Sequence, residues 1–336
     1  MSSSGHSQMQ AVPASDPFEL LGVKLNPDDT LSRPAFPDMP AMSDPDLPIP
    51  ILSKDVPVNP SRRTWFRVLL PRDRVRGPPG GKLPLVVYFH GGGFILFSAA
   101  SAVLESLFED LVLLLPAVVV SVEYRLAPEH RLPAAYDDAL EALEVIRTTK
   151  DEWISTYADL SNCYLMGGSS GGNIAYHTGL RVATGGLNDL KPLNIRGLIL
   201  HQPFFGGMKR TESELRLFHD RALPAVVTDL MWELALPIGA DRDHEYCNPT
   251  TDSNPGLAAM EKVRSLGWRV LVAGSSGDPL IDRQVELVKV MEEKGVSVVS
   301  HFIDGHCHGA ELSNREGSMI LARVIKDFMS VTTMGC

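Results

Sequence analysis

The chain has 336 residues, of which 44% are hydrophobic, and its formal net charge is -10. This length and apolar content predict one large core in a single catalytic domain with a small cap. The acidic balance has no basic stripe, which excludes a surface built for nucleic acid or anionic lipid, so we expect a small uncharged or cationic partner.

The chain shows no feature of a secreted or membrane-spanning protein. Residues 1–10 lack the basic and apolar regions of a signal peptide. The longest apolar run, 111–122, is broken by Pro116 and is far shorter than the roughly 20 residues that span a bilayer. The four cysteines have no paired spacing. We therefore expect a cytosolic protein without a membrane partner, either a monomer or a homodimer.

Residues 1–60 contain eleven of the 25 prolines, which predicts an arm lying over the body of the protein rather than a packed helical layer. One short helix is expected within it, because Asp16 can cap a helix and Pro17 suits the first helical position. The apolar side chains of this helix are Phe18, Leu20 and Leu21. We expect the helix to form part of a lid.

From residue 65 onward, short β-rich runs alternate with longer amphipathic stretches, a pattern typical of a mostly parallel sheet flanked by crossover helices. The strands are predicted at 65–70, 83–89, 117–122, 163–166, 195–201, 268–273 and 296–302. The helices are predicted at 99–115, 134–150, 172–183, 282–294 and 316–330. The segment 204–255 is longer than one crossover requires and is expected to form a second cap element on a catalytic domain of residues 61–336.

A glycine-rich segment follows the strand predicted at 83–89, with the sequence His90-Gly91-Gly92-Gly93-Phe94. Residues without side chains let backbone N–H groups approach a developing oxyanion, so this segment predicts an oxyanion hole. A phosphate-binding glycine loop is the alternative. It is poorly supported, because no Gly-Lys-Ser/Thr or dinucleotide fingerprint follows.

A strand, a tight turn and a helix are predicted around Gly167-Gly168-Ser169-Ser170-Gly171-Gly172-Asn173. This is the arrangement of a nucleophile elbow, in which the residues two before and two after the serine must be small. Gly-x-Ser-x-Gly fits both Ser169 and Ser170, so spacing alone does not choose between them. The alternative is a glycine-rich turn that happens to contain two serines.

A serine on a nucleophile elbow requires an acid and then a histidine further along the chain, on loops that follow later strands. Asp278 lies just past the strand at 268–273 and can orient an imidazole, although it also suits a turn cap before Pro279. Asp282 is expected to be the N-cap of the helix that follows.

Three histidines follow Asp278. His301 lies in a predicted strand and is expected to be a packing or edge residue. His308 lies on the loop between the last strand and the last helix, where a general base can reach the nucleophile, and His306 is the alternative. The His306-Cys307-His308 cluster also suggests zinc, but no second ligand pair has suitable spacing, so no metal is predicted.

With these motifs, the chain resembles the plant carboxylesterases of the hormone-sensitive-lipase branch of α/β-hydrolases. The motifs that carry the resemblance are the glycine segment, the elbow, Tyr124-Arg125-Leu126-Ala127-Pro128-Glu129, Leu132-Pro133-Ala134-Ala135-Tyr136-Asp137-Asp138 and Gly277-Asp278-Pro279-Leu280-Ile281-Asp282. The resemblance implies an α/β-hydrolase fold capped by the arm and by an insert after the sixth strand. It also implies cofactor-free hydrolysis of a small-molecule ester. The implied triad is Ser169, Asp278 and His308, and the implied oxyanion hole is His90, Gly91, Gly92 and Ser170.

The elbow departs from the usual family form, because Gly168 replaces an acidic residue and Ser170 replaces alanine. This form resembles that of a plant carboxylesterase that removes an acetyl group from an alkaloid intermediate, which suggests deacylation of a specialised metabolite. The family also includes the gibberellin receptor, which lacks the catalytic histidine, and a group of dehydratases and cyclases. His308 counts against a receptor, whereas the motifs do not exclude a lyase-like reaction.

Overall fold

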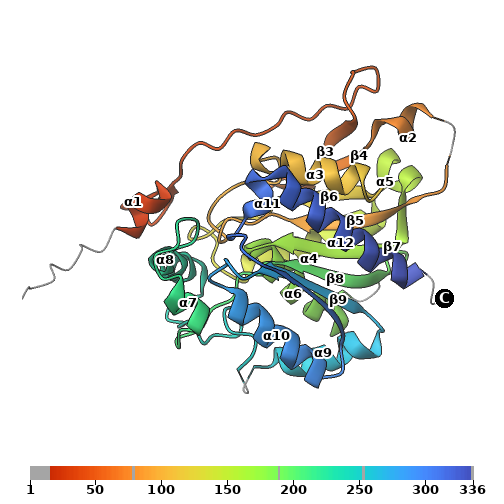
Figure 1. The fold of residues 1–336 in the computed structure, drawn as a ribbon. Coiled ribbons are helices and arrows are strands. Elements are labelled where there is room, and N and C mark those ends of the chain that lie inside the picture. Colours follow the sequence, from red (N-terminus) through yellow and green to blue (C-terminus); the bar gives the residue numbers. More distant parts are fainter. Residues whose placement is uncertain (1–15, 78–79, 188–189, 252–253, 334–336) are drawn as a thin grey trace, which may run out of the picture.

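The computed structural model describes residues 16–77, 80–187, 190–251 and 254–333. An eight-stranded sheet in the spatial order β10-β9-β8-β7-β5-β6-β4-β3 lies at its centre (Figure 1). Its strands are β3 (Ile51–Asn59), β4 (Thr64–Pro71), β5 (Leu83–Phe89), β6 (Val118–Val122), β7 (Ala158–Gly168), β8 (Ile195–His201), β9 (Arg269–Ser275) and β10 (Ser297–Ile303). The strand β4 is antiparallel to both of its neighbours, β3 and β6, and all the other neighbouring pairs are parallel. The carboxyl ends of the parallel strands therefore share one edge, where α/β enzymes place their sites.

Helices cover both faces of the sheet (Figure 1). The helices α3 (Glu105–Leu113) and α12 (Arg315–Thr333) pack on one face. The other face is covered by α4 (Ala134–Thr148), α6 (Ser170–Ala183), α9 (Gly256–Ser265) and α10 (Ile281–Glu293). Successive side chains of a strand point to opposite faces, so a strand covered on both sides must be apolar throughout. The near-continuous Val and Leu content of β5 and β6 meets this requirement, and the predicted α/β-hydrolase fold is confirmed.

The remaining elements are short or belong to the cap. They are α1 (Pro17–Leu21), β1 (Lys24–Leu25), β2 (Leu31–Ser32), α2 (Arg72–Arg76), the 3₁₀ turn η1 (Ala102–Leu104), α5 (Glu152–Tyr157), α7 (Glu212–Arg216), α8 (Ala225–Ala235) and α11 (Ala310–Ser313). All seven predicted strands and all five long predicted helices are present, with shifted ends. The helix predicted from residue 99 starts later, as η1 followed by α3.

The edge strand β3 was not expected from the sequence. Pro57 lies within it, and a proline cannot donate a backbone hydrogen bond to a sheet, which argues against a central strand. At the edge this is tolerated, and the pairing with β4 shifts register between Pro57 and Asn59. Residues 51–59, counted within the arm by sequence, thus extend the sheet.

The cap combines the arm with the insert that follows β8, the sixth strand of the large sheet in chain order. Asp16 caps α1 as expected, since its Oδ1 accepts a hydrogen bond from the Phe18 N–H at 2.9 Å. Although α1 and α8 lie about two hundred residues apart in the chain, they pack against each other (Figure 1). The division of the chain at residue 60 remains a prediction.

Asp282 and Arg283, at the start of α10, contact the insert and not their own helix terminus. The N-cap of α10 is Leu280, so the expectation that Asp282 caps this helix is wrong. Asp282 Oδ2 instead accepts a hydrogen bond from the Ser213 N–H at 2.7 Å, in the first turn of α7. Arg283 and Glu214 form a buried ion pair at 3.1 Å. A carboxylate near the start of a helix serves whichever helix N-terminus lies closest in space, which sequence alone does not reveal.

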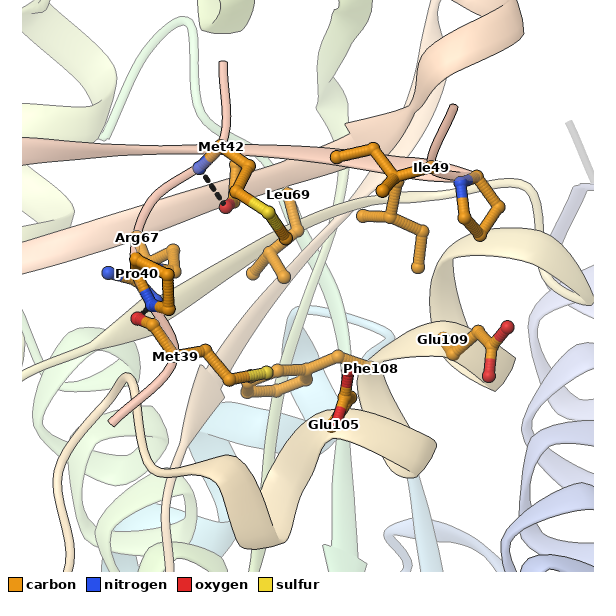
Figure 2. A pocket seen from close by; sticks show the side chains of 12 residues that line it. Met39, Pro40, Met42, Ile49, Arg67, Leu69, Glu105, Phe108 and Glu109 are labelled. Carbon is orange, nitrogen blue, oxygen red and sulfur yellow. Dashed lines mark hydrogen bonds between the residues drawn. The ribbon is translucent and has the colours of Figure 1, made fainter. Parts of the chain in front are cut away.

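A cavity of about 170 Å³ opens between the arm, the β3–β4 edge of the sheet and α3 (Figure 2). Its walls are mostly apolar and include Met39, Leu69 and Phe108, with Glu105 and Glu109 on α3. It shares no lining residue with the cavity at Ser169 described below.

Candidate active site

The turn between β7 and α6 holds Ser169 in a backbone conformation that residues other than glycine rarely adopt, with φ 54° and ψ -123°. Glycines make the turn possible. A Cβ atom at Gly167 would lie 2.1 Å from the Gly171 carbonyl carbon, and one at Gly171 would lie 1.9 Å from the Phe89 carbonyl oxygen. The turn therefore presents Ser169 at the carboxyl edge of the sheet.

The hydroxyl of Ser169 faces a histidine. Ser169 Oγ lies 2.9 Å from His308 Nε2, whereas the buried Ser170 hydroxyl has no partner among the described residues. The Ser169 N–H also donates to the His201 carbonyl at 2.9 Å. Of the two serines that fit the sequence pattern, Ser169 is thus the one positioned for proton transfer.

Asp278 lies behind His308, with 3.1 Å between Asp278 Oδ1 and His308 Nδ1. The carboxylate is fully buried and accepts hydrogen bonds from the Leu280 N–H at 2.9 Å and from Gln284 Nε2 at 2.7 Å. His301 lies on the edge strand β10. The backbone carbonyl of His306 accepts a hydrogen bond from the Ser275 hydroxyl. The structure thus brings Ser169, His308 and Asp278 into one chain of contacts.

Two opposing effects set the pKa of His308. Burial disfavours the charged imidazolium and by itself would lower the pKa. The charge of Asp278 and its hydrogen bond to the ring outweigh burial, so the pKa of His308 lies above its ordinary value of 6.5. An imidazole with a raised pKa is a stronger base, as proton abstraction from a hydroxyl requires.

Gln202 holds the loop that carries His308, although no sequence motif points to it. Its Oε1 accepts a hydrogen bond from the Gly309 N–H at 2.7 Å, and its Nε2 donates to the Cys307 carbonyl at 3.3 Å. These two residues flank His308. Gln202 is buried and has a positive φ of 42°. Its place directly after β8, at the carboxyl edge, is the one signal that could have identified it.

Three backbone N–H groups next to Ser169 are free to bind an anion. Within the described parts of the chain, the N–H groups of Gly91, Gly92 and Ser170 have no hydrogen-bond acceptor. A Cβ atom at Gly91 would lie 3.0 Å from the Gly168 carbonyl oxygen, and Gly92 has a φ of +105°. Glycine is therefore needed for the loop to approach the serine this closely.

The buried side chain of His90 supports this loop through a contact with its backbone. Its ring is fully buried, its Nδ1 lies 2.8 Å from the Gly91 carbonyl, and it stacks on Tyr124 with 4.2 Å between ring centroids. Burial lowers the pKa of His90 to about 4, so the ring is neutral near pH 7. Its side chain therefore contributes shape and hydrogen bonding, without charge, next to the glycine loop.

A cavity of about 190 Å³ opens onto Ser169 and His308. Its walls are largely apolar and come from the arm, the glycine loop and the cap, including Leu21, Leu96, Phe97, Leu223, Val227 and Met231. Among the described residues, no cluster of side chains suited to a metal ion is present.

Comparisons with known proteins identify the family of the chain. The profile of a family described as alpha/beta hydrolase fold matches residues 86–312. Carboxylesterase 20 of Arabidopsis thaliana is 49% identical over 94% of this chain and 97% of its own length. The 3-O-acetylpapaveroxine carboxylesterase CXE1 of Papaver somniferum is 47% identical over 88% and 91%.

A solved structure shares the same architecture. The hyperthermophilic esterase from Pyrobaculum calidifontis superimposes with a TM-score of 0.66 at 26% identity, over 84% of this chain and 85% of its own. Fold, matched profile and close relatives all point to one activity. The chain therefore belongs to the α/β-hydrolase family, among the plant carboxylesterases, and is a serine hydrolase that cleaves carboxylic esters.

Proposed function

We propose that Ser169, His308 and Asp278 form the catalytic triad of this esterase. The observation that carries the proposal is the 2.9 Å contact between Ser169 Oγ and His308 Nε2, with Asp278 on the far side of the ring. His308 takes the Ser169 proton as the oxygen attacks the ester carbonyl. Asp278 holds the imidazole in place and stabilises the imidazolium that forms.

The reaction then runs through an acyl-enzyme. The tetrahedral intermediate collapses as the bond to the alcohol oxygen breaks, and His308 returns the proton to the departing alcohol. Water then attacks the acyl group on Ser169 and loses a proton to His308. When the acyl bond to Ser169 breaks, the carboxylic acid leaves and the serine is regenerated. No cofactor or metal enters this cycle.

The oxyanion hole in this proposal is formed by the N–H groups of Gly91, Gly92 and Ser170, with His90 supporting the loop. Support comes from the absence of any acceptor for these donors within the described residues. Donors fixed before the reaction stabilise the developing negative charge without reorganising, and each is worth about 100- to 1000-fold in rate.

We propose a small acyl group on a specialised metabolite as the substrate. The relative from Papaver somniferum is named for an O-acetylated compound. The cavity at Ser169 is also small and largely apolar. A panel of esters with the same alcohol and increasing acyl length tests this, and we expect acetate or another short acyl group to give the highest kcat/KM.

The triad is tested by incubation with a fluorophosphonate, followed by peptide mass spectrometry and by hydrolysis of a p-nitrophenyl ester. We expect the label on Ser169 in the wild-type protein and in Ser170→Ala, because Ser170 enters the proposal only through its backbone. Ser169→Ala should lose both the label and nearly all turnover. A label on another residue, or full turnover in Ser169→Ala, contradicts the triad.

The two alternatives predict different results. A hormone-binding receptor should bind its ligand without turnover, and the contact of His308 with Ser169 argues against it. In a lyase-like reaction, the acid product would gain no oxygen from solvent, so hydrolysis in ¹⁸O-labelled water separates the two chemistries.

The cytosolic location and the assembly as a monomer or homodimer remain predictions. The described cysteines Cys163, Cys247 and Cys307 are free thiols, which suits a reducing compartment. Within the described residues, no helix is long and apolar enough to cross a membrane. Fractionation and light scattering test these two predictions.

A further inference from the structure

Gly168 leaves an open space beside the nucleophile. A Cβ atom at this position would lie 3.6 Å from Tyr88 Oη, 3.9 Å from Glu311 Oε1 and 3.9 Å from His201 Cδ2. These are ordinary contacts with side chains. Unlike Gly167 and Gly171, Gly168 is therefore not required by the turn itself. We call the space bounded by Gly168, Tyr88, Glu311 and His201 the 168 recess.

The 168 recess opens into the cavity at Ser169, because Gly168, Tyr88 and Glu311 all line that cavity. The polar side chains of the recess are Tyr88, His201 and Glu311, which come from β5, β8 and α11, far apart in the chain. All three residues are at least nine-tenths buried. A ligand bound at Ser169 can therefore extend a group into the recess.

Glu311 gives the recess a carboxylate, which has the ring of His201 on one side. Its Oε2 lies 3.0 Å from His201 Nε2, whereas Oε1 faces Gly168, 3.9 Å from where a Cβ atom would lie at that position. Burial alone would raise the pKa of Glu311, but the contact with His201 outweighs it and lowers the pKa. The carboxylate is thus ionised near neutral pH, with one oxygen available to a ligand.

Tyr88 adds a neutral hydroxyl. Burial, and to a smaller extent the charge of Glu311, raises the pKa of Tyr88, so the phenol keeps its proton. Within the described chain, no hydrogen bond to this hydroxyl is present. A carboxylate oxygen and a hydroxyl that both face a largely apolar cavity can each gain a hydrogen bond from a ligand bound there.

The rest of the cavity has no permanently charged cation among its described residues, although His308, with its raised pKa, also lines it. Its walls are mainly apolar, and among its described lining residues there is no lysine or arginine. In such surroundings, a hydrogen bond from an ammonium group to a carboxylate is strengthened by the low local dielectric. A neutral group of the same size gains only a weaker hydrogen bond.

We propose that the 168 recess is a subsite for a protonated amine, so that the enzyme favours esters that carry a cationic nitrogen near the scissile bond. The proposal rests on the proposed function, because it places the amine in the same cavity as Ser169. Glu311 supplies the charge, Tyr88 the hydroxyl, and Gly168 the space.

The test compares two ligands of similar size, 2-phenylethylamine and 2-phenylethanol, as competitive inhibitors of p-nitrophenyl acetate hydrolysis near neutral pH. The amine is protonated there and the alcohol is neutral. For the wild-type enzyme we expect the amine to bind about tenfold more tightly. Equal binding, or tighter binding of the alcohol, overturns the proposal.

Two variants locate the effect. Glu311→Gln keeps the size of the side chain and removes its charge, and Gly168→Asn fills the recess without removing Glu311. In both, the preference for the amine should fall to about one. The second variant also covers the case in which Glu311→Gln fails to fold. Glu105→Gln, in the separate cavity of Figure 2, is the matched control and should keep the full preference.

Calorimetric titration with the same two ligands separates this proposal from the proposed function. If Ser169 proves not to be the nucleophile, the amine preference and its loss in Glu311→Gln remain measurable without turnover. If turnover depends on Ser169 but both variants keep the amine preference, the subsite is wrong while the triad stands.

Discussion

Gln202 accepts a hydrogen bond from the Gly309 N–H at 2.7 Å, and this contact ties the loop that carries His308 to the end of β8. The same amide donates to the carbonyl of Cys307, on the other side of the histidine. The position of the imidazole is therefore fixed through both of its chain neighbours.

Replacing this amide should weaken catalysis more than binding. In Gln202→Met both hydrogen bonds are lost, and His308 loses its fixed place relative to Ser169. We expect kcat to fall by about 10- to 100-fold with little change in KM, because a small misplacement of a catalytic group is costly. A purely structural role would lower the melting temperature and leave kcat per folded molecule unchanged, so activity is normalised to the folded fraction measured by circular dichroism.

The pH dependence should report the raised pKa of His308. In the proposed triad neutral His308 is the base, so kcat/KM should rise with pH around a midpoint above 6.5. Asp278→Asn removes the charge that raises the pKa, while burial still lowers it. The midpoint should then move to lower pH as the rate falls by at least about a hundredfold. A midpoint that stays in place in Asp278→Asn would show that another group titrates.

Substitution of Gly171 should destabilise the protein far more than substitution of Gly168, on the other side of Ser169. Gly171→Ala places a Cβ atom 1.9 Å from the Phe89 carbonyl oxygen, whereas Gly168→Ala makes only ordinary contacts. We expect Gly171→Ala to lower the free energy of unfolding by about 3 kcal/mol or to prevent folding. Gly168→Ala should change it by less than about 1 kcal/mol. Urea unfolding measures both, and equal losses would contradict the described turn.

The buried ion pair of Arg283 with Glu214 should be needed to hold the cap in place. Glu214→Gln leaves the Arg283 charge buried without its partner, and we expect a loss of about 3 kcal/mol in the free energy of unfolding. The matched control is Glu293→Gln, which breaks an exposed pair with Lys289 at 3.9 Å and should cost less than about 0.5 kcal/mol. Similar losses in the two variants would show that the cap does not depend on the buried pair.

The order of the site residues along the chain could be predicted because it follows from local patterns. The turn at Ser169 needs small residues at fixed offsets, and the glycine loop at residues 91–93 follows a recognisable strand. These constraints act within a few residues, so the sequence displays them directly. The pattern at the serine fitted two registers, and the contact with His308 distinguishes them.

The features that sequence reasoning missed depend on partners far away in the chain. Gln202 contacts residues that lie 105 and 107 positions later, and no local pattern marks it. Asp282 was assigned to the helix that follows it, but its carboxylate reaches α7, 69 positions earlier. The strand β3 was missed because it contains Pro57, which argues against a strand unless the strand lies at the edge of a sheet.

The dipeptide His201-Gln202 serves three parts of the site. The His201 carbonyl holds the Ser169 N–H, its ring contacts Glu311, and Gln202 ties down the loop of His308. A substitution there would disturb the proposed nucleophile, the proposed base and the 168 recess together. Helix α8 and the arm contribute only apolar wall residues to the same cavity. Changes of substrate range, whether by natural divergence or by directed evolution, should therefore accumulate in α8 and the arm, while the end of β8 stays invariant.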